Sequence, residues 1–154
     1  MSYQLLKSLH LLGVVLFLGN IIVTAAWKAL ADRTRIPSVI AHSQRMVTFT
    51  DVVFTATGAA LIAVTGQLMA GGRDAILATP WLTWAYGLFI ATGLLWLFVL
   101  IPIQWQQARM ARGFEHGNDV PESYWRLSRR WALFGSIATL LPLANLYVMV
   151  FKPH

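Results

Sequence analysis

The sequence predicts an all-α integral membrane protein, a four-helix bundle, and two observations carry this prediction. Four long apolar runs with short connections occupy most of the 154 residues. Only 12% of the residues are charged, roughly half the proportion that is usual in a soluble domain. Four spans with their connections leave no room for a soluble domain, so we expect a single transmembrane domain over residues 1–154.

Each apolar run is long enough to form one membrane-spanning helix. We place the spans at about residues 4–28, 46–70, 81–105 and 127–150. The first run is too long for a signal peptide and lacks a small-residue cleavage site, so it is expected to be a retained helix. Pro102 and Pro142 fall inside the third and fourth spans, where each is expected to bend its helix.

The basic residues predict the orientation of the helices. Nine of the twelve Lys and Arg residues lie in the first and third connections: Lys28, Arg33, Arg35, Arg45, Arg109, Arg112, Arg126, Arg129 and Arg130. The positive-inside rule places these connections in the cytoplasm and both the N and C termini outside. The net charge of +6 is therefore mainly a topology signal, and we expect contact with the lipid bilayer and no nucleic acid.

Two stripes of polar and small residues are expected to face the interior of the bundle. One stripe on the first span contains His10, Gly13, Phe17, Asn20 and Thr24. One stripe on the second span contains Asp51, Thr55, Gly58, Ile62 and Gly66. The members recur at steps of three or four, and small residues let helix backbones approach closely, so the two stripes are expected to face each other.

The helical rise separates these stripes into two layers. His10 lies about 9 Å inside the outer boundary at 1.5 Å per residue. The residues expected at its depth are Thr65, Met69, Trp84, Asn145 and Met149. Asp51 enters from the cytoplasmic side, near the levels of Asn20, Thr24 and Gln104. His10 and Asp51 are therefore not expected to touch.

His10 is the strongest candidate for a cofactor ligand. An imidazole inside a membrane helix bundle can ligate the iron of haem b, and Lys7, one turn outward, is placed to pair with a haem propionate. The sixth position would be open or filled by Met69 or Met149, because His42 and His116 lie toward the cytoplasm and His154 is terminal. His10 could instead bind copper or another metal, or form only a structural hydrogen bond.

For Asp51, an ion pair with Arg45, Arg129 or Arg130 is the expected role, with proton relay or substrate binding as the alternatives. Asn20 and Thr24 are expected to form interhelical hydrogen bonds. The sequence contains no phosphate loop, nucleophile elbow or HExxH motif, and it lacks cysteine. Hydrolysis, phosphoryl transfer and thiol chemistry are therefore not expected.

Four segments together resemble the bacterial membrane family called domain of unknown function 2269. They are YQLLKSLHLLGVVLFLGN, DVVFTATGAALIAVTG, LLWLFVLIPIQWQQARMA and YVMVFKP. The resemblance covers essentially the whole chain. It extends distantly to two families with a histidine early in the first span, the haem-associated HemJ type and the copper-associated CopD type. The resemblance implies a location in the bacterial inner membrane. His10 is the only residue of this chain that we match to a residue of those two families.

These observations lead us to expect a membrane-embedded b-type haem protein with a redox or electron-transfer role. If the protein is an enzyme, we expect a haem-dependent oxidoreductase. Its partner would be a membrane redox protein or a second copy of the chain. The alternatives are a non-enzymatic accessory or assembly subunit of a membrane complex, and a small metal or solute transporter.

Overall fold

The computed structural model describes residues 2–114 and 119–153. Its four long helical segments are each apolar and long enough to cross a membrane: Tyr3–Thr34, Pro37–Ala70, Pro80–Phe114 and Glu122–Phe151. The described residues form helices and no strands, which confirms the prediction of an all-α membrane bundle. Each predicted span lies within one of these segments, and the segments continue beyond the predicted cytoplasmic boundaries. His116 and His154 lie outside the described residues.

Two of the long segments contain a short π-helical stretch. The elements in order are α1 (Tyr3–Thr34), α2 (Pro37–Thr50), η1 (Asp51–Ala56), α3 (Thr57–Ala70), α4 (Arg73–Ala78), α5 (Pro80–Leu95), η2 (Trp96–Leu100), α6 (Ile101–Phe114) and α7 (Glu122–Phe151). Asp51 begins the first π-helical stretch, and Pro102 follows the second by two residues. Single π turns inside α-helices are frequent at functional sites, which draws attention to the Asp51 level of the bundle.

Local sequence signals explain where the segments begin and end. The Ser2 hydroxyl accepts a hydrogen bond from the Leu5 backbone N–H at 3.3 Å and caps α1. Pro37 and Pro80 occupy the first turns of α2 and α5, where the missing N–H has no cost. Gly71 and Gly72 have φ values of 77° and 107°, so this turn uses the left-handed region that glycine tolerates.

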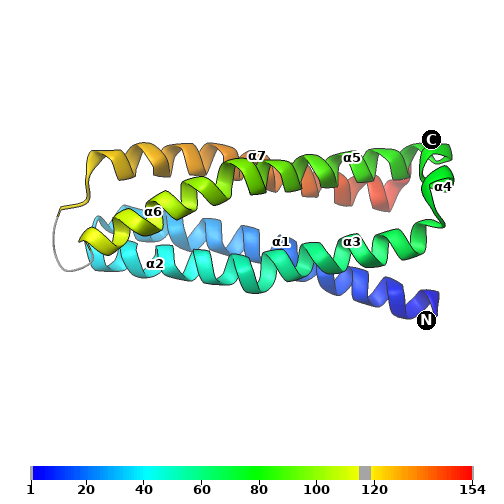
Figure 1. The fold of residues 1–154 in the computed structure, drawn as a ribbon, viewed down its shortest axis with the longest axis horizontal. Coiled ribbons are helices and arrows are strands. Elements are labelled where there is room, and N and C mark those ends of the chain that lie inside the picture. Colours follow the sequence, from blue (N-terminus) through cyan, green and yellow to red (C-terminus); the bar gives the residue numbers. More distant parts are fainter. Residues whose placement is uncertain (1, 115–118, 154) are drawn as a thin grey trace.

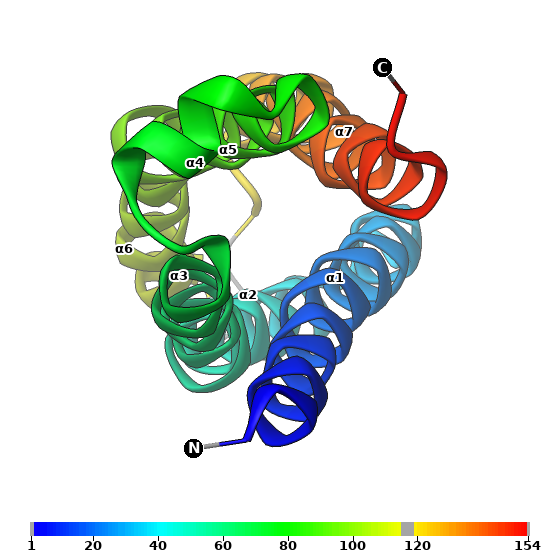
Figure 2. The same cartoon turned by 90° about the vertical axis from the view of Figure 1, so that its right-hand side faces the viewer.

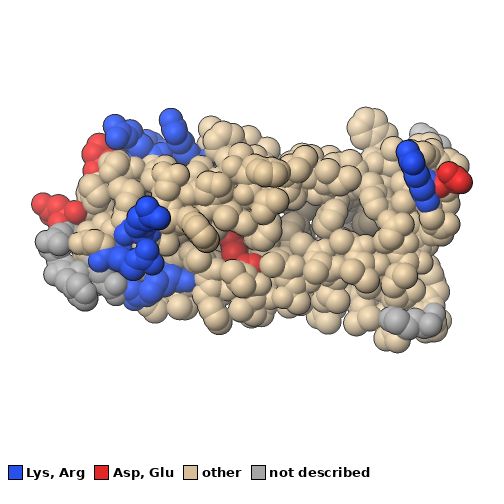
Figure 3. Space-filling model, in the orientation of Figure 1, with Lys and Arg blue, Asp and Glu red and all other residues tan. Residues whose placement is uncertain are grey.

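The segments form two layers, and consecutive segments run antiparallel to one another (Figure 1). One layer contains α1, α2 and α3, and the other contains α5, α6 and α7. Viewed from the end that carries both termini, the four segments occupy the corners of the bundle (Figure 2). We call this end the outer end, following the predicted orientation. Lys and Arg gather at the opposite, inner end (Figure 3), as the charge distribution of the sequence predicts.

The predicted contact between the two stripes is confirmed where α1 packs against α3. A Cβ atom on Gly58 would lie 2.7 Å from the backbone nitrogen of Phe17 and 2.8 Å from the carbonyl oxygen of Gly13. A Cβ atom on Gly13 would lie 3.0 Å from the carbonyl oxygen of Gly58. The two helices therefore touch backbone to backbone, which only glycine permits at this crossing.

Large apolar side chains close the middle and the inner half of the bundle. One buried cluster contains Val47, Leu100, Ile103, Trp131 and Ala138. A second cluster, nearer the inner end, contains Ile40, Ala41, Ala111, Phe114 and Tyr124. Here α2 packs against α6, and α7 packs against both α6 and α1. The outer half is built differently, because α1 packs on α3 and α5 packs on α7 with a cavity between the two pairs.

Candidate ligand site in the outer half of the bundle

A cavity of about 280 Å³ lies between the two helix pairs in the outer half. Each of α1, α3, α5 and α7 contributes four of its lining residues, most of them apolar. The molecular surface is hollowed between α3 and α5 in this half (Figure 3). The cavity is therefore a largely apolar site that is reached from the side of the bundle, where lipid would lie.

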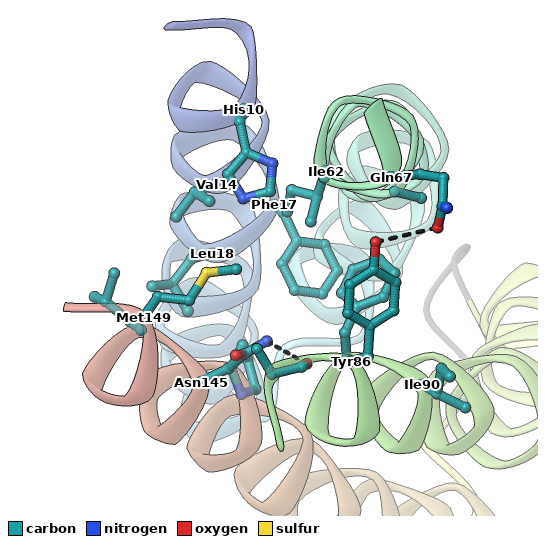
Figure 4. Close-up of a pocket in the computed structure, with 16 residues that line it drawn as sticks. His10, Val14, Phe17, Leu18, Ile62, Gln67, Tyr86, Ile90, Asn145 and Met149 are labelled. Carbon is teal, nitrogen blue, oxygen red and sulfur yellow. Dashed lines mark hydrogen bonds between the residues drawn. The ribbon is translucent and has the colours of Figure 1, made fainter. Parts of the chain in front are cut away.

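His10 places its imidazole against this cavity from α1 (Figure 4). The side chain is buried, and its Nδ1 atom lies 2.9 Å from the Thr65 hydroxyl oxygen. That hydroxyl donates its own hydrogen to the Leu61 carbonyl oxygen, so it accepts from Nδ1–H. The imidazole is thereby held in the tautomer whose Nε2 carries a lone pair. Nε2 is buried, and no described residue provides it with a hydrogen-bond partner.

Gly66 makes room for this imidazole on α3. A Cβ atom at position 66 would lie 3.4 Å from the Cε1 atom of His10. This distance is at the short limit of an ordinary van der Waals contact. The glycine thus belongs to the histidine site, and its place in the second stripe is explained by the ring that it accommodates.

Two other polar groups line the cavity. Asn145 on α7 donates from Nδ2 to the Ala85 carbonyl oxygen at 3.1 Å, which fixes its Oδ1 atom as an acceptor. That Oδ1 atom is buried and finds no partner among the described residues. The Tyr86 hydroxyl donates to Gln67 Oε1 at 3.1 Å and bridges α5 and α3 at the side opening. The cavity therefore presents two unpaired acceptors, His10 Nε2 and Asn145 Oδ1.

The structure places the other residues predicted around His10 as follows. Met149 lines the cavity and points inward from α7 (Figure 4), whereas Met69 is half-buried one turn outward of Thr65 and is not among the described lining residues. Lys7 is exposed at the outer end, and Trp84 is 68% exposed. Of the two predicted methionines, the one facing the imidazole across the bundle is thus Met149.

Asp51 lies in a separate layer and is surrounded by neutral donors. Its Oδ1 atom accepts from Asn20 Nδ2 at 2.9 Å and from the Thr55 hydroxyl at 3.0 Å. Its Oδ2 atom accepts from Gln104 Nε2 at 2.7 Å. Asn20 also donates to the Thr55 hydroxyl oxygen at 2.8 Å. The carboxylate is therefore held by α1, η1 and α6 together.

The sequence predicts an ion pair for Asp51, whereas the structure provides its carboxylate with amide and hydroxyl donors. Arg45, Arg129 and Arg130 have exposed side chains at the inner end, and Arg129 lies 3.5 Å from Glu122. Asp51 is only 7% exposed, and both of its carboxylate oxygens accept from these neutral donors. Thr24 donates to the carbonyl oxygen of Asn20 within α1, so it supports the helix rather than the carboxylate.

The layers of His10 and Asp51 are distinct. Their threonine partners, Thr65 and Thr55, are ten positions apart on one helical segment, which is about 15 Å at the helical rise. No single ligand of moderate size contacts both groups through these atoms.

Sequence reasoning missed a buried charged cluster at the inner end. Lys28 is 1% exposed, and its Nζ atom donates to Asp32 Oδ2 and to the Tyr124 hydroxyl oxygen, each at 3.0 Å. The Tyr124 hydroxyl and the Ser128 hydroxyl donate in turn to Asp32. The spacing of four residues between Lys28 and Asp32 on one helix is the signal that identifies this pair. The cluster ties α1 to α7.

The available ligands favour a cofactor that needs one protein donor. Within residues 2–114 and 119–153, three or more His, Asp or Glu side chains nowhere come together in a way that could hold a metal ion. A porphyrin brings four nitrogen ligands of its own, so a single imidazole with a free Nε2 atom matches its chemistry. The Thr65 contact is the kind of outer partner that orients a metal-ligating histidine.

Comparison with known proteins agrees with the membrane architecture. Residues 4–153 match the family model described as "Predicted integral membrane protein (DUF2269)". No curated protein and no solved structure matches the chain. The match covers all four helical segments.

Proposed function

The chain belongs to the DUF2269 family of predicted integral membrane proteins, and we propose that it binds a b-type haem in the outer cavity through His10. We further propose a redox or electron-transfer role for this haem protein in the bacterial inner membrane. The single observation that carries the proposal is the buried, unpaired Nε2 atom of His10, held by Thr65 in the tautomer that a metal ligand requires.

The surroundings of His10 support the same proposal. The cavity walls are apolar and come from all four helical segments, so they exclude water from the face of the imidazole. The cavity volume of about 280 Å³ lies near the lower limit of roughly 300 Å³ for small-molecule sites. A ring as large as a porphyrin therefore needs the side opening between α3 and α5 as well.

Each residue has a defined task in this proposal. Haem, when bound, supplies one-electron chemistry. His10 would hold the haem iron through Nε2, and Thr65 orients its imidazole by accepting from Nδ1–H. Met149 is placed to approach the opposite face, and Lys7 lies at the outer end within one helical turn of His10, where a carboxylate of the cofactor could reach it.

The test is haem content and absorption spectra after purification in mild detergent from haem-replete cells. We expect about one haem per chain in the wild type, read from oxidised and dithionite-reduced spectra, because one imidazole provides one axial bond. His10→Ala should insert into the membrane and lose the haem. His42→Ala is the matched control, because His42 is exposed at the inner end, and it should retain the haem.

A wild-type protein that stays colourless after haem is added would contradict the proposal. Loss of haem in both histidine variants would also contradict it, since His42 is remote from the cavity. In that case an accessory subunit or a small-solute transporter would be the remaining class of function.

A specific observation favours a second candidate ligand, a lipid-soluble quinol. His10 Nε2 and Asn145 Oδ1 are both buried acceptors without a partner among the described residues, and a quinol carries two hydroxyl donors. The side opening would admit it from the bilayer. Asn145→Leu separates the candidates, because it removes one quinol contact but leaves the axial ligand of haem in place. A wild-type protein that takes up no haem but binds a quinol, with weaker quinol binding in Asn145→Leu, would favour the quinol.

A further inference from the structure

We infer that a hydrated polar column runs from Asp51 to the inner end of the bundle and conducts protons between the cytoplasm and the Asp51 carboxylate. We define the column by Asp51, Gln104, Gln107, Gln44 and Lys28. This inference concerns the inner half alone and does not depend on the ligand of the outer cavity.

The first observation is a set of buried amide groups without partners. The Gln107 side chain is 0% exposed, and neither its Nε2 nor its Oε1 atom has a hydrogen-bond partner among the described residues. Gln44 is likewise 0% exposed, and its Oε1 atom has no partner there. An unpaired buried amide costs about 1–3 kcal/mol, so polar groups in this position are normally satisfied by bound water.

The second observation is the order of these groups along the bundle. Gln44 lies seven residues before Asp51 on the same helical segment, or about 10 Å farther inward. Gln107 lies one turn inward of Gln104, which donates to Asp51. Because α2 packs against α6, and Gln44 Nε2 is 3.5 Å from the carbonyl oxygen of Gln104, the two unpaired amides belong to one interface.

The column ends at the buried charged cluster. Lys28 is eight residues inward of Asn20, the α1 partner of Asp51, which is about 12 Å at the helical rise. Gln44 and Gln107 therefore occupy the levels between Asp51 and Lys28. Polar groups thus follow one another from the middle of the bundle to the inner end, where most of the Lys and Arg residues lie (Figure 3).

The chemistry of these atoms selects water as the occupant. Gln107 offers one donor and one acceptor, and Gln44 offers an acceptor, so a molecule that both donates and accepts is required. A metal ion would leave the Gln107 N–H donors unpaired, and an apolar ligand would leave all three atoms unpaired. A cavity of about 30 Å³ also lies beside Asp51 and Gln104, which is enough room for a water molecule.

Asp51 is the group at the outer end of the column that can bind a proton. The side chains that donate to its carboxylate are neutral: Asn20 from α1, Thr55 from η1 and Gln104 from α6. Lys28 is already paired with Asp32. In the proton transfer, one proton leaves cytoplasmic water, passes by exchange along bound waters, and bonds to an Asp51 carboxylate oxygen, whose negative charge it neutralises.

The test follows hydrogen–deuterium exchange at Asp51 by infrared spectroscopy of the full chain in lipid nanodiscs. The carboxylic acid C=O band is assigned by its loss in Asp51→Asn, and its isotope shift is timed after transfer to D2O. Gln107→Met and Gln44→Met replace each amide by an apolar side chain of similar shape. We expect exchange to slow about tenfold or more in each variant, because the apolar chain interrupts the hydrogen bonds of the bound water.

Gln106→Met is the matched control, because Gln106 is the exposed neighbour of Gln107 on α6, and it should exchange at the wild-type rate. Thermal unfolding gives a second readout. If the interface is dry, Gln107→Met removes two unsatisfied polar atoms and raises the melting temperature, which contradicts the inference.

Two infrared results would overturn the inference. One is wild-type exchange in both Gln107→Met and Gln44→Met. The other is the absence of an Asp51 acid band at every pH at which the protein stays folded, because the carboxylate would then accept no proton.

Discussion

The outer and inner halves of the bundle differ in how they pair their buried ionisable groups. In the outer half the helix pairs separate around a cavity of about 280 Å³, and His10 Nε2 and Asn145 Oδ1 face it without partners among the described residues. In the inner half the charged groups satisfy one another. Lys28 is bound by Asp32 and Tyr124, and Asp51 is bound by neutral donors from three elements.

The difference distinguishes groups that stabilise the bundle from groups that are available to bind a ligand. A buried charge that has its partners within the chain stabilises one arrangement of helices when its geometry is satisfied. A buried acceptor without a partner costs free energy until a ligand supplies one. On this basis the Lys28 cluster is a structural tie, and His10 is a binding group.

The largest expected effect tests the structural tie. Asp32→Asn leaves the ammonium group of Lys28, which is 1% exposed, without its counter-charge. We expect the free energy of unfolding to fall by about 3–5 kcal/mol, the usual cost of an uncompensated buried charge. Denaturant unfolding in detergent measures it, with Asp74→Asn at an exposed site of the outer end as the control. A loss equal to that of the control would show that the cluster does not hold α1 to α7.

A smaller loss of stability is expected from a change at the close contact between α1 and α3, which lies between the two halves. Gly58→Ala places a Cβ atom 2.7 Å from the backbone nitrogen of Phe17, so the helices must move apart. We expect a loss of about 1–3 kcal/mol in unfolding free energy, as in other overpacked interiors. Gly87→Ala on α5 has open space around its Cβ position and should be neutral or slightly stabilising. Equal melting temperatures for the two variants would contradict the close contact.

The smallest effect is expected at the side opening of the outer cavity. Tyr86→Phe removes the hydroxyl that donates to Gln67 and bridges α5 and α3. We expect at most about 1 kcal/mol of destabilisation, because this hydrogen bond is exposed. Tyr147→Phe, which keeps the ring that stacks on Phe151, is the control. Faster uptake of a bilayer-soluble ligand in Tyr86→Phe alone would identify the bridge as the entrance, and equal uptake in both variants would locate the entrance elsewhere.

Much of the fold follows from the sequence because helical periodicity and hydropathy act locally. The two stripes were predicted to meet, and the contact of Gly13 with Gly58 and the hydrogen bond of Asn20 to Asp51 confirm it. The helices continue past the predicted inner boundaries of the spans, and Lys28, which marks one of these boundaries by its charge, is buried. Its burial depends on Tyr124, which is 96 positions away in the chain.

The candidate site was predictable only in part, because the pattern along one helix does not show how separate helices pack. His10 and its depth follow from one helix, and Thr65 follows from the rise along a second one. The choice of Met149 over Met69 depends on how the two helix pairs separate, which no single-helix pattern reports. The unpaired state of Gln44 and Gln107 likewise depends on the packing of α2 against α6.

The most direct test of this account is the ¹⁵N NMR spectrum of the His10 imidazole in haem-free wild-type protein, assigned by its loss in His10→Ala. The account predicts a neutral ring with a proton on Nδ1 and a bare Nε2, because the Thr65 hydroxyl accepts from Nδ1–H. It further predicts that Thr65→Val abolishes this preference and that added haem perturbs the Nε2 signal. A proton fixed on Nε2, or an Nε2 signal that does not respond to haem, would contradict the assignment of His10 as the binding group.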